Sequence, residues 1–337
     1  MAINKINLEN FTVFEKLDIS FSNGINVFIG ENGTGKTHIM KVIYSACQAA
    51  RIDVSFSEKL VKVFKPDNLR ISRLARRKPG NFRSMVVVES DAARISAEFH
   101  SKTNKWDAEV TGEAKWEKQL SSLTSTFIPA KEILSNAWNL EAAVDKNNVD
   151  FDETYIDIIT SAKVDISAGK DSKERKKYLD ILQNITSGKV TVENERFYLK
   201  PGSHAKIEFS LVAEGIRKIA LLWQLIKNGT LEKGAVLFWD EPEANINPAH
   251  IPVMVDMLLE LQRSGVQIFI STHDYVFSKY LEVKRNEKDD VIFYSLYPKE
   301  NGVEVESNRY FKDLRVNAIV ETFDRLLEDV FNKNLGD

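Results

Sequence analysis

Residues 30–37 read Gly-Glu-Asn-Gly-Thr-Gly-Lys-Thr, which fits the pattern G-x-x-x-x-G-K-T. Glycines let backbone N–H groups close around phosphate oxygens, and the start of a helix adds partial positive charge. Lys36 can reach the β- and γ-phosphates, and the Thr37 hydroxyl can ligate Mg²⁺. The loop therefore predicts binding of a nucleoside triphosphate, with ATP and Mg²⁺ as the expected cofactors. The predicted contacts are Gly30, Glu31, Asn32, Gly33, Thr34, Gly35, Lys36, Thr37 and His38.

The residues on either side of this loop predict the elements that position it. The apolar run at residues 25–29 is typical of a short buried strand, and apolar residues recur at helical spacing over residues 39–43. The loop therefore joins a strand to a helix, as the motif requires. The alternative is a glycine-rich turn with an incidental lysine, and this context disfavours it.

Two carboxylates follow a second apolar strand, predicted at residues 235–239. Asp240 is placed to hold Mg²⁺ through a water, and Glu241 to orient and deprotonate the attacking water. A third apolar strand at residues 266–270 leads to His273, which can hydrogen-bond the γ-phosphate. Solvated acids and a structural histidine are the alternatives. The order of loop, carboxylate pair and histidine favours hydrolysis, with Glu241, His273 and the loop lysine as catalytic groups.

The composition is typical of a cytoplasmic protein. Its 337 residues are 43% hydrophobic and 28% charged, which suits a sizeable core in one large or two modest domains. Cys47 is the only cysteine, which excludes an intrachain disulfide and fits a reducing cytosol. The N-terminus lacks the apolar core of a signal peptide, and the apolar run at residues 219–226 is too short for a membrane span. We therefore expect no membrane partner.

A basic stretch between residues 70 and 83 is a candidate for nucleic-acid contact, although the net charge of −3 does not favour such contact overall. Its members are Arg70, Arg73, Arg76, Arg77, Lys78 and Arg83. One interpretation is contact with a nucleic-acid backbone or an acidic partner. The other is a solvated helix face that ends at Pro79-Gly80, because charge runs usually face water.

The segments between these motifs predict further strands and helices. Residues 1–29 and 84–110 alternate as antiparallel strands do, with the last of these strands expected at residues 106–110. Residues 133–185 have a charged, helical pattern with a break near residues 167–169. That length suits one short helical pair and is too short for a long coiled-coil arm.

These motifs resemble the ABC-type ATPase set. Walker A would lie at residues 30–37, Walker B with its catalytic glutamate at 236–241, and a switch-histidine loop at 271–274. Residues 238–248 are similar to the Asp-Glu-Pro-Glu-x-x-Leu-His-Pro stretch of stand-alone bacterial AAA/ABC-type ATPases. Those proteins are relatives of the OLD, RecF and SMC proteins and are often found in phage-defence loci. Residues 126–131 likewise resemble their Tyr-Ile-Pro-Ala-Arg segment.

Two features depart from that family. The signature Leu-Ser-Gly-Gly-Gln is absent, and residues 213–218, Ala-Glu-Gly-Ile-Arg-Lys, stand at about the expected distance before Walker B. The resemblance implies that Gly215, with Glu214, lies at the γ-phosphate of a partner subunit; an ordinary helix start is the alternative. No glutamine marks a Q-loop, and Lys131 or Glu132 stands near that place.

The resemblance implies an α/β fold, an ABC-type (SMC/OLD-like) P-loop ATPase head with an antiparallel β lobe and an inserted strand-and-helix subdomain. We expect residues 1–51 and 200–337 to form the split ATPase core, and residues 52–199 to form the insertion. Two subunits are expected to close head-to-tail around ATP, as a homodimer or within a higher homo-oligomer. Hydrolysis would then reopen them.

The resemblance also suggests what the switch controls. We expect a regulatory ATPase of a bacterial anti-phage defence system that acts on a separately encoded effector, such as a nuclease or toxin. The segment after His273 is too short for a nuclease domain of its own. The alternative is a DNA-repair or recombination ATPase that contacts DNA through the basic stretch. A transporter subunit is disfavoured by the missing signature.

Overall fold

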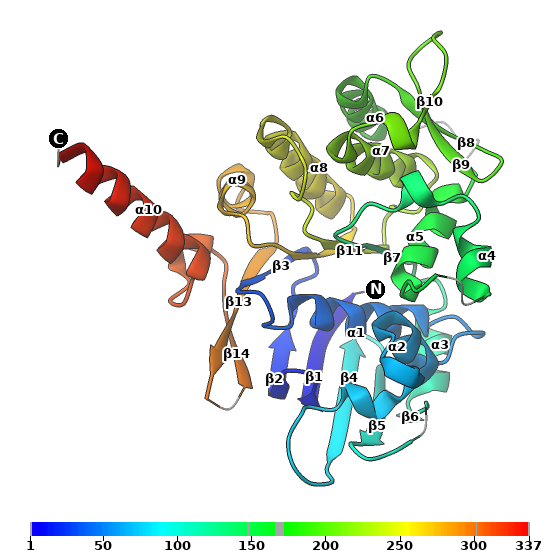
Figure 1. The fold of residues 1–337 in the computed structure, drawn as a ribbon, viewed down its shortest axis with the longest axis vertical. Coiled ribbons are helices and arrows are strands. Elements are labelled where there is room, and N and C mark those ends of the chain that lie inside the picture. The colour runs from blue at the N-terminus through cyan, green and yellow to red at the C-terminus, as the bar shows by residue number, and fades with distance from the viewer. Residues whose placement is uncertain (1, 105, 147–148, 166–171, 301, 336–337) are drawn as a thin grey trace.

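A six-stranded sheet forms the centre of the computed structural model, which describes residues 2–104, 106–146, 149–165, 172–300 and 302–335 (Figure 1). The strand order is β14-β13-β3-β12-β11-β7, and every neighbouring pair is parallel except the hairpin of β13 with β14. Parallel strands are covered on both faces, so their apolar runs are buried throughout. The strands are β3 Ile25–Gly30, β7 Ser125–Ile128, β11 Val236–Asp240, β12 Gln267–Ser271, β13 Val291–Lys299 and β14 Gly302–Asn308.

Successive residues of the central strands point into two different hydrophobic cores. Phe28, Phe238 and Phe269 belong to the core shared with the first helix and the N-terminal strands. Their chain neighbours Leu237 and Ile268 belong to the core on the opposite face. The rings of Phe238 and Phe269 stack with centroids 5.1 Å apart. Because a slip of one residue would exchange the two cores, this alternation specifies the register of the strands that end at the site.

A five-stranded antiparallel sheet contains the N-terminus, in the order β2-β1-β4-β5-β6. Helix α1 lies between this lobe and the central sheet, with α2 and α3 beside it (Figure 1). The strands are β1 Ile3–Phe11, β2 Phe14–Ser20, β4 Arg83–Ser90, β5 Arg94–His100 and β6 Glu109–Thr111. The helices are α1 Lys36–Gln48, α2 Phe56–Phe64 and α3 Glu113–Leu120.

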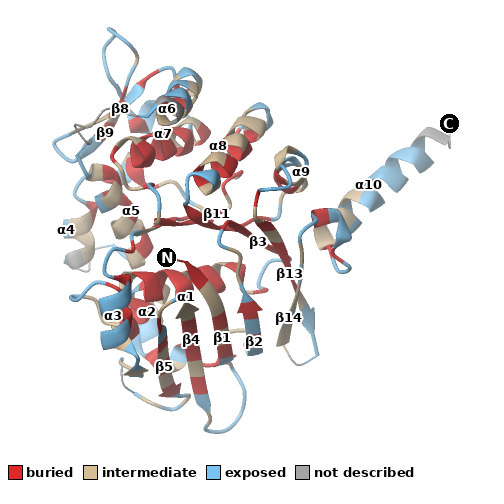
Figure 2. Ribbon diagram, turned by 180° about the vertical axis from the view of Figure 1, so that it is seen from behind, coloured by how far each residue is buried: buried red, intermediate tan, exposed pale blue. Residues whose placement is uncertain are grey.

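Helices α7 Glu214–Lys227, α8 Ile251–Arg263 and α9 Tyr275–Lys284 lie on the other side of the central sheet (Figures 1 and 2). Helices α4 Leu140–Asp145, α5 Glu153–Lys163 and α6 Lys173–Thr186 lie in the same part of the molecule as a small sheet of β8 Lys189–Glu193, β9 Arg196–Lys200 and β10 Ile207–Glu208, and β8 of that sheet contacts α7. Helix α10, Ala318–Leu335, extends away from the body, and most of it is exposed (Figure 2). None of the helices described is long and apolar enough to cross a membrane.

The predicted parallel core sheet and antiparallel lobe are both present, but residues 52–199 do not pair only among themselves. Strand β4 pairs with β1, so β4, β5 and β6 continue the N-terminal sheet. Strand β7 pairs with β11 in the central sheet. The domain boundaries stay a prediction. The strand expected at residues 106–110 begins only at Glu109, and the break expected near 167–169 lies outside the described residues.

Candidate nucleotide site

The phosphate-binding loop runs from the end of β3 to the start of α1. A Cβ atom on Gly30 would lie 2.1 Å from the carbonyl oxygen of Leu296, and the φ angle of Gly30 is +139°. Gly35 has a φ angle of +91° and immediately precedes Lys36, the first residue of α1. A side chain is strained at either position, so the close approach and the turn explain both glycines.

Lys36 is buried inside the loop. Its Nζ atom donates hydrogen bonds to the carbonyl oxygens of Gly30 and Glu31, at 2.8 and 2.9 Å. The Thr34 hydroxyl donates to the same Glu31 oxygen at 2.8 Å. Burial lowers the pKa of Lys36, and the charge of Asp240 opposes that shift. The amine therefore lies within the loop, where it can exchange these carbonyl contacts for phosphate oxygens.

Thr37 and Asp240 come together although they are 203 residues apart in the chain. The Thr37 hydroxyl is 3.1 and 3.0 Å from the two carboxylate oxygens, and the Ser271 hydroxyl donates to the same carboxylate. Burial raises the pKa of Asp240, while the hydrogen bonds from Ser271 and Thr37 lower it. A hydroxyl and a carboxylate are oxygen ligands of the kind that Mg²⁺ prefers, so the donor set fits this ion.

No group of three or more histidine, cysteine, aspartate or glutamate side chains that could hold a metal ion occurs in the part of the chain that the structure describes. Mg²⁺ bound with a nucleotide does not require such a group, because phosphate oxygens and water complete its coordination. Thr37 and Asp240 are the residues that would hold the ion here.

Glu241 and His273 lie side by side at the ends of neighbouring strands. The Nδ1 atom of His273 is 3.4 Å from Oε1 of Glu241, and their side chains are 52% and 32% exposed. Glu241 has a φ angle of +49°, and its backbone N–H donates to the carbonyl oxygen of Ser271 at 3.0 Å. A non-glycine residue in this left-handed conformation is held there by its surroundings, and such residues cluster at functional sites.

A hollow of about 710 Å³ opens beside the loop. Its wall includes Gly33 and His38 from the loop and α1, Thr12 and Val13 from the N-terminal lobe, and Arg73. Burial lowers the pKa of His38 to about 4, so the imidazole is neutral at pH 7. The His38 Nδ1 atom is buried and makes no hydrogen bond with the residues described.

A second hollow, of about 540 Å³, lies on the opposite side of the loop. Its lining includes Glu31, Asn32, His273, Tyr275 and Phe323. The rings of Tyr275 and Phe323 stack with centroids 4.1 Å apart, which anchors the base of α10 beside the site.

Part of the basic stretch lies against the first hollow. The expected helix is absent, but most of the basic side chains do face solvent, as the second interpretation expects. Short 3₁₀ turns at Asp67–Leu69 and Ile71–Leu74 replace the expected α-helix. Arg73, Arg76 and Arg77 line the hollow of about 710 Å³. Arg73 pairs with Asp67 at 2.6 Å, Arg76 with Glu15 at 2.7 Å, and Lys78 donates to Asn10 at 2.6 Å; Arg70 is exposed. Sequence reasoning did not predict that these arginines lie at the nucleotide loop.

The segment at residues 213–218 forms the start of α7 and packs on the turn after β11 of its own chain. A Cβ on Gly215 would be 2.4 Å from the carbonyl oxygen of Asn245. The Asn245 side-chain amide donates to Glu214 at 2.9 Å. Gly215 is buried, so the structure gives it a contact within the chain. Its expected place at a partner's γ-phosphate stays a prediction.

Near the expected Q-loop, the side chain of Glu132 is 1% exposed and pairs with Arg217 of α7. This pair joins the segment after β7 to the candidate signature helix. Lys131, the other candidate, is exposed. Neither Arg217 nor its neighbour Lys218 was singled out from the sequence, because nothing local marks a helical basic residue as buried.

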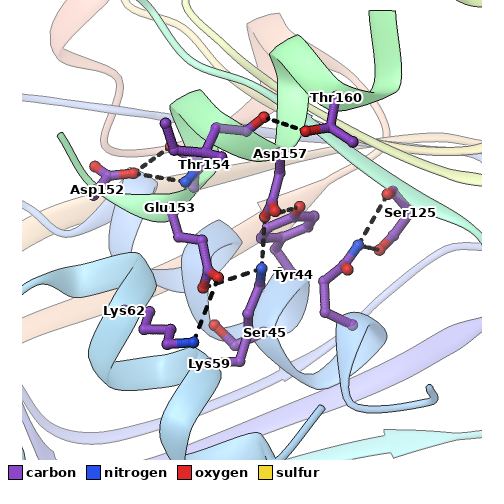
Figure 3. A network of polar contacts seen from close by, with 12 residues as sticks. Tyr44, Ser45, Lys59, Lys62, Ser125, Asp152, Glu153, Thr154, Asp157 and Thr160 are labelled. Atoms are coloured by element: carbon purple, nitrogen blue, oxygen red, sulfur yellow. Dashed lines mark hydrogen bonds and ion pairs between the residues drawn. The ribbon is translucent and has the colours of Figure 1, made fainter. Parts of the chain in front are cut away.

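A polar network fastens α1 to the elements around it (Figure 3). Lys59 of α2 lies 2.7 Å from Asp157 and 3.2 Å from Glu153, both of α5. The Tyr44 hydroxyl of α1 donates to the same Asp157 carboxylate at 2.6 Å. Lys41, one turn after Thr37 on α1, pairs with Asp152 at 2.7 Å. The helix that carries the phosphate-binding loop is therefore fixed to α2 and α5.

Two protein-family models match this chain, each over part of its length. The one described as an AAA ATPase domain matches residues 1–82, which contain the phosphate-binding loop. The one described as an AAA domain, putative AbiEii toxin, Type IV TA system, matches residues 144–278, which contain Asp240 and His273. These matches support an ABC-type ATPase.

Solved structures share the fold of this chain. The SMC head bound to the C-winged helix domain of ScpA has a TM-score of 0.60 at 14% identity, covering 94% of this chain and 100% of its own. The SMC head with an extended coiled coil, bound to a ScpA domain derived from Pyrococcus furiosus, has a TM-score of 0.55 at 13% identity, covering 98% and 99%. The predicted fold, an α/β ABC-type P-loop ATPase head, is confirmed.

Curated relatives match a smaller part of the chain. The DNA replication and repair protein RecF of Streptococcus suis (strain 05ZYH33) is 32% identical over 105 residues, which are 31% of this chain and 28% of that protein. The RecF protein of Bacillus thuringiensis (strain Al Hakam) is 40% identical over 62 residues, 18% of this chain and 16% of that protein. The chain therefore matches under a third of the length of these relatives.

Proposed function

We propose that this protein hydrolyses ATP to ADP and phosphate and uses the cycle as a molecular switch. The observation that carries the proposal is the convergence of Thr37 and Asp240 at the phosphate-binding loop, with Glu241 and His273 side by side next to them. These are the parts that phosphoryl transfer to water requires: a phosphate cradle, metal ligands and a base.

In the proposed complex, the loop at residues 30–37 holds the triphosphate through backbone N–H groups and the Lys36 amine. The base and ribose occupy the hollow beside Gly33 and His38, whose volume of about 710 Å³ is in the range of small-molecule sites. Arg73 in its wall offers a planar cation that can stack on the base or pair with a phosphate.

Hydrolysis follows from the positions of the two strand-end residues. Thr37 and Asp240 would hold Mg²⁺, which would supply positive charge to the phosphate oxygens. Glu241 accepts a proton from the attacking water as the water oxygen bonds to the γ-phosphorus and the bond to the β–γ bridging oxygen breaks. His273, beside Glu241, donates a hydrogen bond to the γ-phosphate, so its contacts change when that group leaves.

We propose that two subunits close head-to-tail around ATP, as a dimer or within a larger homo-oligomer. Residues 213–218 of each subunit would then approach the γ-phosphate held by the other. Glu31, Asn32 and His273 line the hollow of about 540 Å³ next to the loop. A second subunit would reach the γ-phosphate through this hollow. Loss of the γ-phosphate removes the shared contact and reopens the assembly.

The role we favour is control of a separately encoded effector, a nuclease or toxin, in a cytoplasmic anti-phage system. The family model that matches residues 144–278 is described as a putative AbiEii toxin of a Type IV TA system, which supports a link to such systems. The second candidate is a DNA-repair ATPase, and it is supported by the RecF relatives and by the basic stretch. Its DNA contacts would be Arg70, Arg73, Arg76, Arg77 and Lys78.

One experiment separates the two roles. The tagged protein is purified from its native host with nuclease treatment, bound proteins are identified by mass, and ATPase activity is measured with and without DNA. A stoichiometric partner and an ATPase rate indifferent to DNA support the effector role. The DNA role predicts stimulation by DNA that Arg70→Ala with Lys78→Ala abolishes. Neither residue lines the hollow of about 710 Å³, so ATP binding is expected to stay unchanged and serves as the control.

A further inference from the structure

The turn after β11 holds Glu241 in a conformation that its own residues do not favour. Glu241 and Asn245 have φ angles of +49° and +62°, and neither is glycine. The Ala244 N–H donates to the Glu241 carbonyl oxygen at 3.1 Å, and the Ile246 N–H donates to the Glu243 carbonyl oxygen at 3.0 Å. Asparagine adopts this left-handed conformation readily, but a glutamate there persists only where neighbouring groups hold it.

Lys218 of α7 supplies such a group from beneath the turn. This residue is 1% exposed, and its Nζ atom donates to the carbonyl oxygens of Ala244 at 2.9 Å and Glu241 at 3.4 Å. A buried ammonium is retained only where hydrogen bonds compensate its lost hydration. Here, two of those bonds go to backbone oxygens of the turn that carries the proposed base.

The start of the same helix touches the far end of the turn. Gly215 lies against the Asn245 carbonyl oxygen so closely that a Cβ would be 2.4 Å away, and Glu214 accepts from the Asn245 amide. The first turns of α7 thus contact the 241–245 turn at both ends.

We propose that Lys218 is a positioning residue, which holds the 241–245 turn so that the Glu241 carboxylate lies beside His273. The inference rests on the proposed role of Glu241 as the base. The Lys218 Nζ atom reaches the turn through hydrogen bonds to backbone oxygens, and none of these bonds goes to the phosphate-binding loop. Its loss should therefore impair the chemical step and leave ATP binding at the loop intact.

The test compares single-turnover ATP hydrolysis and ATP affinity in the full chain. Lys218→Met should slow the chemical step by about 10- to 100-fold, the loss that misplacement of a catalytic group produces, with ATP affinity changed by less than about threefold. Lys218→Arg, which keeps the charge and the donors, should recover part of the rate. Lys233→Met, at an exposed lysine beyond α7, is the matched control and should resemble the parent.

A double variant tests whether Lys218 acts through Glu241. Adding Lys218→Met to Glu241→Gln should cause no further loss, because the base is already absent. Multiplicative losses, or a parallel loss of ATP affinity, would overturn the proposal. If Lys218→Met fails to fold, Gly215→Ala tests the other contact between α7 and this turn, because its methyl group must displace Asn245.

Amide hydrogen exchange gives a readout that does not need turnover. Lys218→Met should speed exchange of the amides at residues 241–246 and leave those of α1 unchanged. Unchanged exchange in the turn would refute the positioning role even if the parent protein hydrolyses ATP. The opposite result is also informative. If the parent protein hydrolyses no ATP but Lys218→Met still speeds exchange in the turn, the assignment of Glu241 as the base is wrong, and the role of Lys218 in holding the turn stands.

Discussion

The Thr37 hydroxyl, at the start of α1, lies 3.1 and 3.0 Å from the carboxylate oxygens of Asp240, the last residue of β11. Strand β3, which leads to Thr37 through the loop, is not a neighbour of β11 in the sheet. Strand β12 lies between them, and its Ser271 donates to the same carboxylate. Two motifs that the sequence separates widely therefore meet through the register of three parallel strands. The site depends on that register as much as on the motifs.

Asp240→Asn should make ATP binding insensitive to Mg²⁺. The amide keeps the shape and a hydrogen-bonding group toward Thr37 but removes the negative charge that would hold the ion. We expect Mg²⁺ to tighten ATP binding at least about tenfold in the parent and hardly at all in the variant, and hydrolysis to fall by about 100-fold or more. Titration of ATP with Mg²⁺ and with EDTA measures this. An equal response to Mg²⁺ in both proteins would contradict the assignment of Asp240.

Glu241→Gln should bind ATP, hydrolyse it about 100- to 10,000-fold more slowly, and accumulate as a dimer. The reason is that the two subunits close when ATP binds and reopen only after ATP is hydrolysed. Light scattering after gel filtration with ATP measures the dimer. Lys36→Ala, which should not bind ATP, is the control and should stay in the nucleotide-free state. Hydrolysis at the parental rate would remove Glu241 as the base.

Ionisation of the buried Glu243 carboxyl should lower the free energy of unfolding as the pH rises from 4.5 to 7. Burial raises its pKa from 4.5 to about 7, and Oε1 accepts from the Thr272 hydroxyl at 2.7 Å. The unfolded chain releases this proton near pH 4.5, while the folded chain keeps it until about pH 7. The unfolded state therefore binds fewer protons in this window, so the free energy of unfolding decreases as pH rises, by up to about 3 kcal/mol.

Glu243→Gln should remove that decrease, because the amide keeps a hydrogen-bonding oxygen and does not ionise. Urea unfolding at intervals from pH 5 to pH 8 measures the free energy of unfolding for both proteins. We expect the variant to be the more stable of the two at pH 8. Parallel pH profiles would show that Glu243 ionises in the folded state as freely as in the unfolded one.

The motifs at residues 30–37 and 236–241 could be found from the sequence because each is local and lies in a strand-loop context with a recognisable pattern. What the sequence could not predict depends on contacts between distant segments. Strand β7 joins the central sheet through pairing with β11, more than a hundred residues later. The arginines near residue 75 face the nucleotide loop because Arg76 N–H pairs with the Asn10 carbonyl oxygen across the lobe, at 2.8 Å. Neither the pairing of β7 with β11 nor the hydrogen bond between Arg76 and Asn10 is marked by a pattern in the residues nearby.

Loss of the Lys59 charge should destabilise the fold more than loss of the Lys62 charge on the same helix, α2. The Lys59 side chain is 6% exposed between Glu153 and Asp157. Lys62, one turn later, is 49% exposed, pairs with Glu58 at 2.8 Å and lies 3.9 Å from Glu153 at the edge of the same network. Lys59→Met fills similar volume but leaves two carboxylates without their buried cation, so we expect a loss of about 3 kcal/mol. Lys62→Met is the matched control, with an expected loss of at most about 1 kcal/mol. Urea unfolding at pH 7 measures both, and equal losses would mean that the buried ion pairs contribute no more than the exposed one.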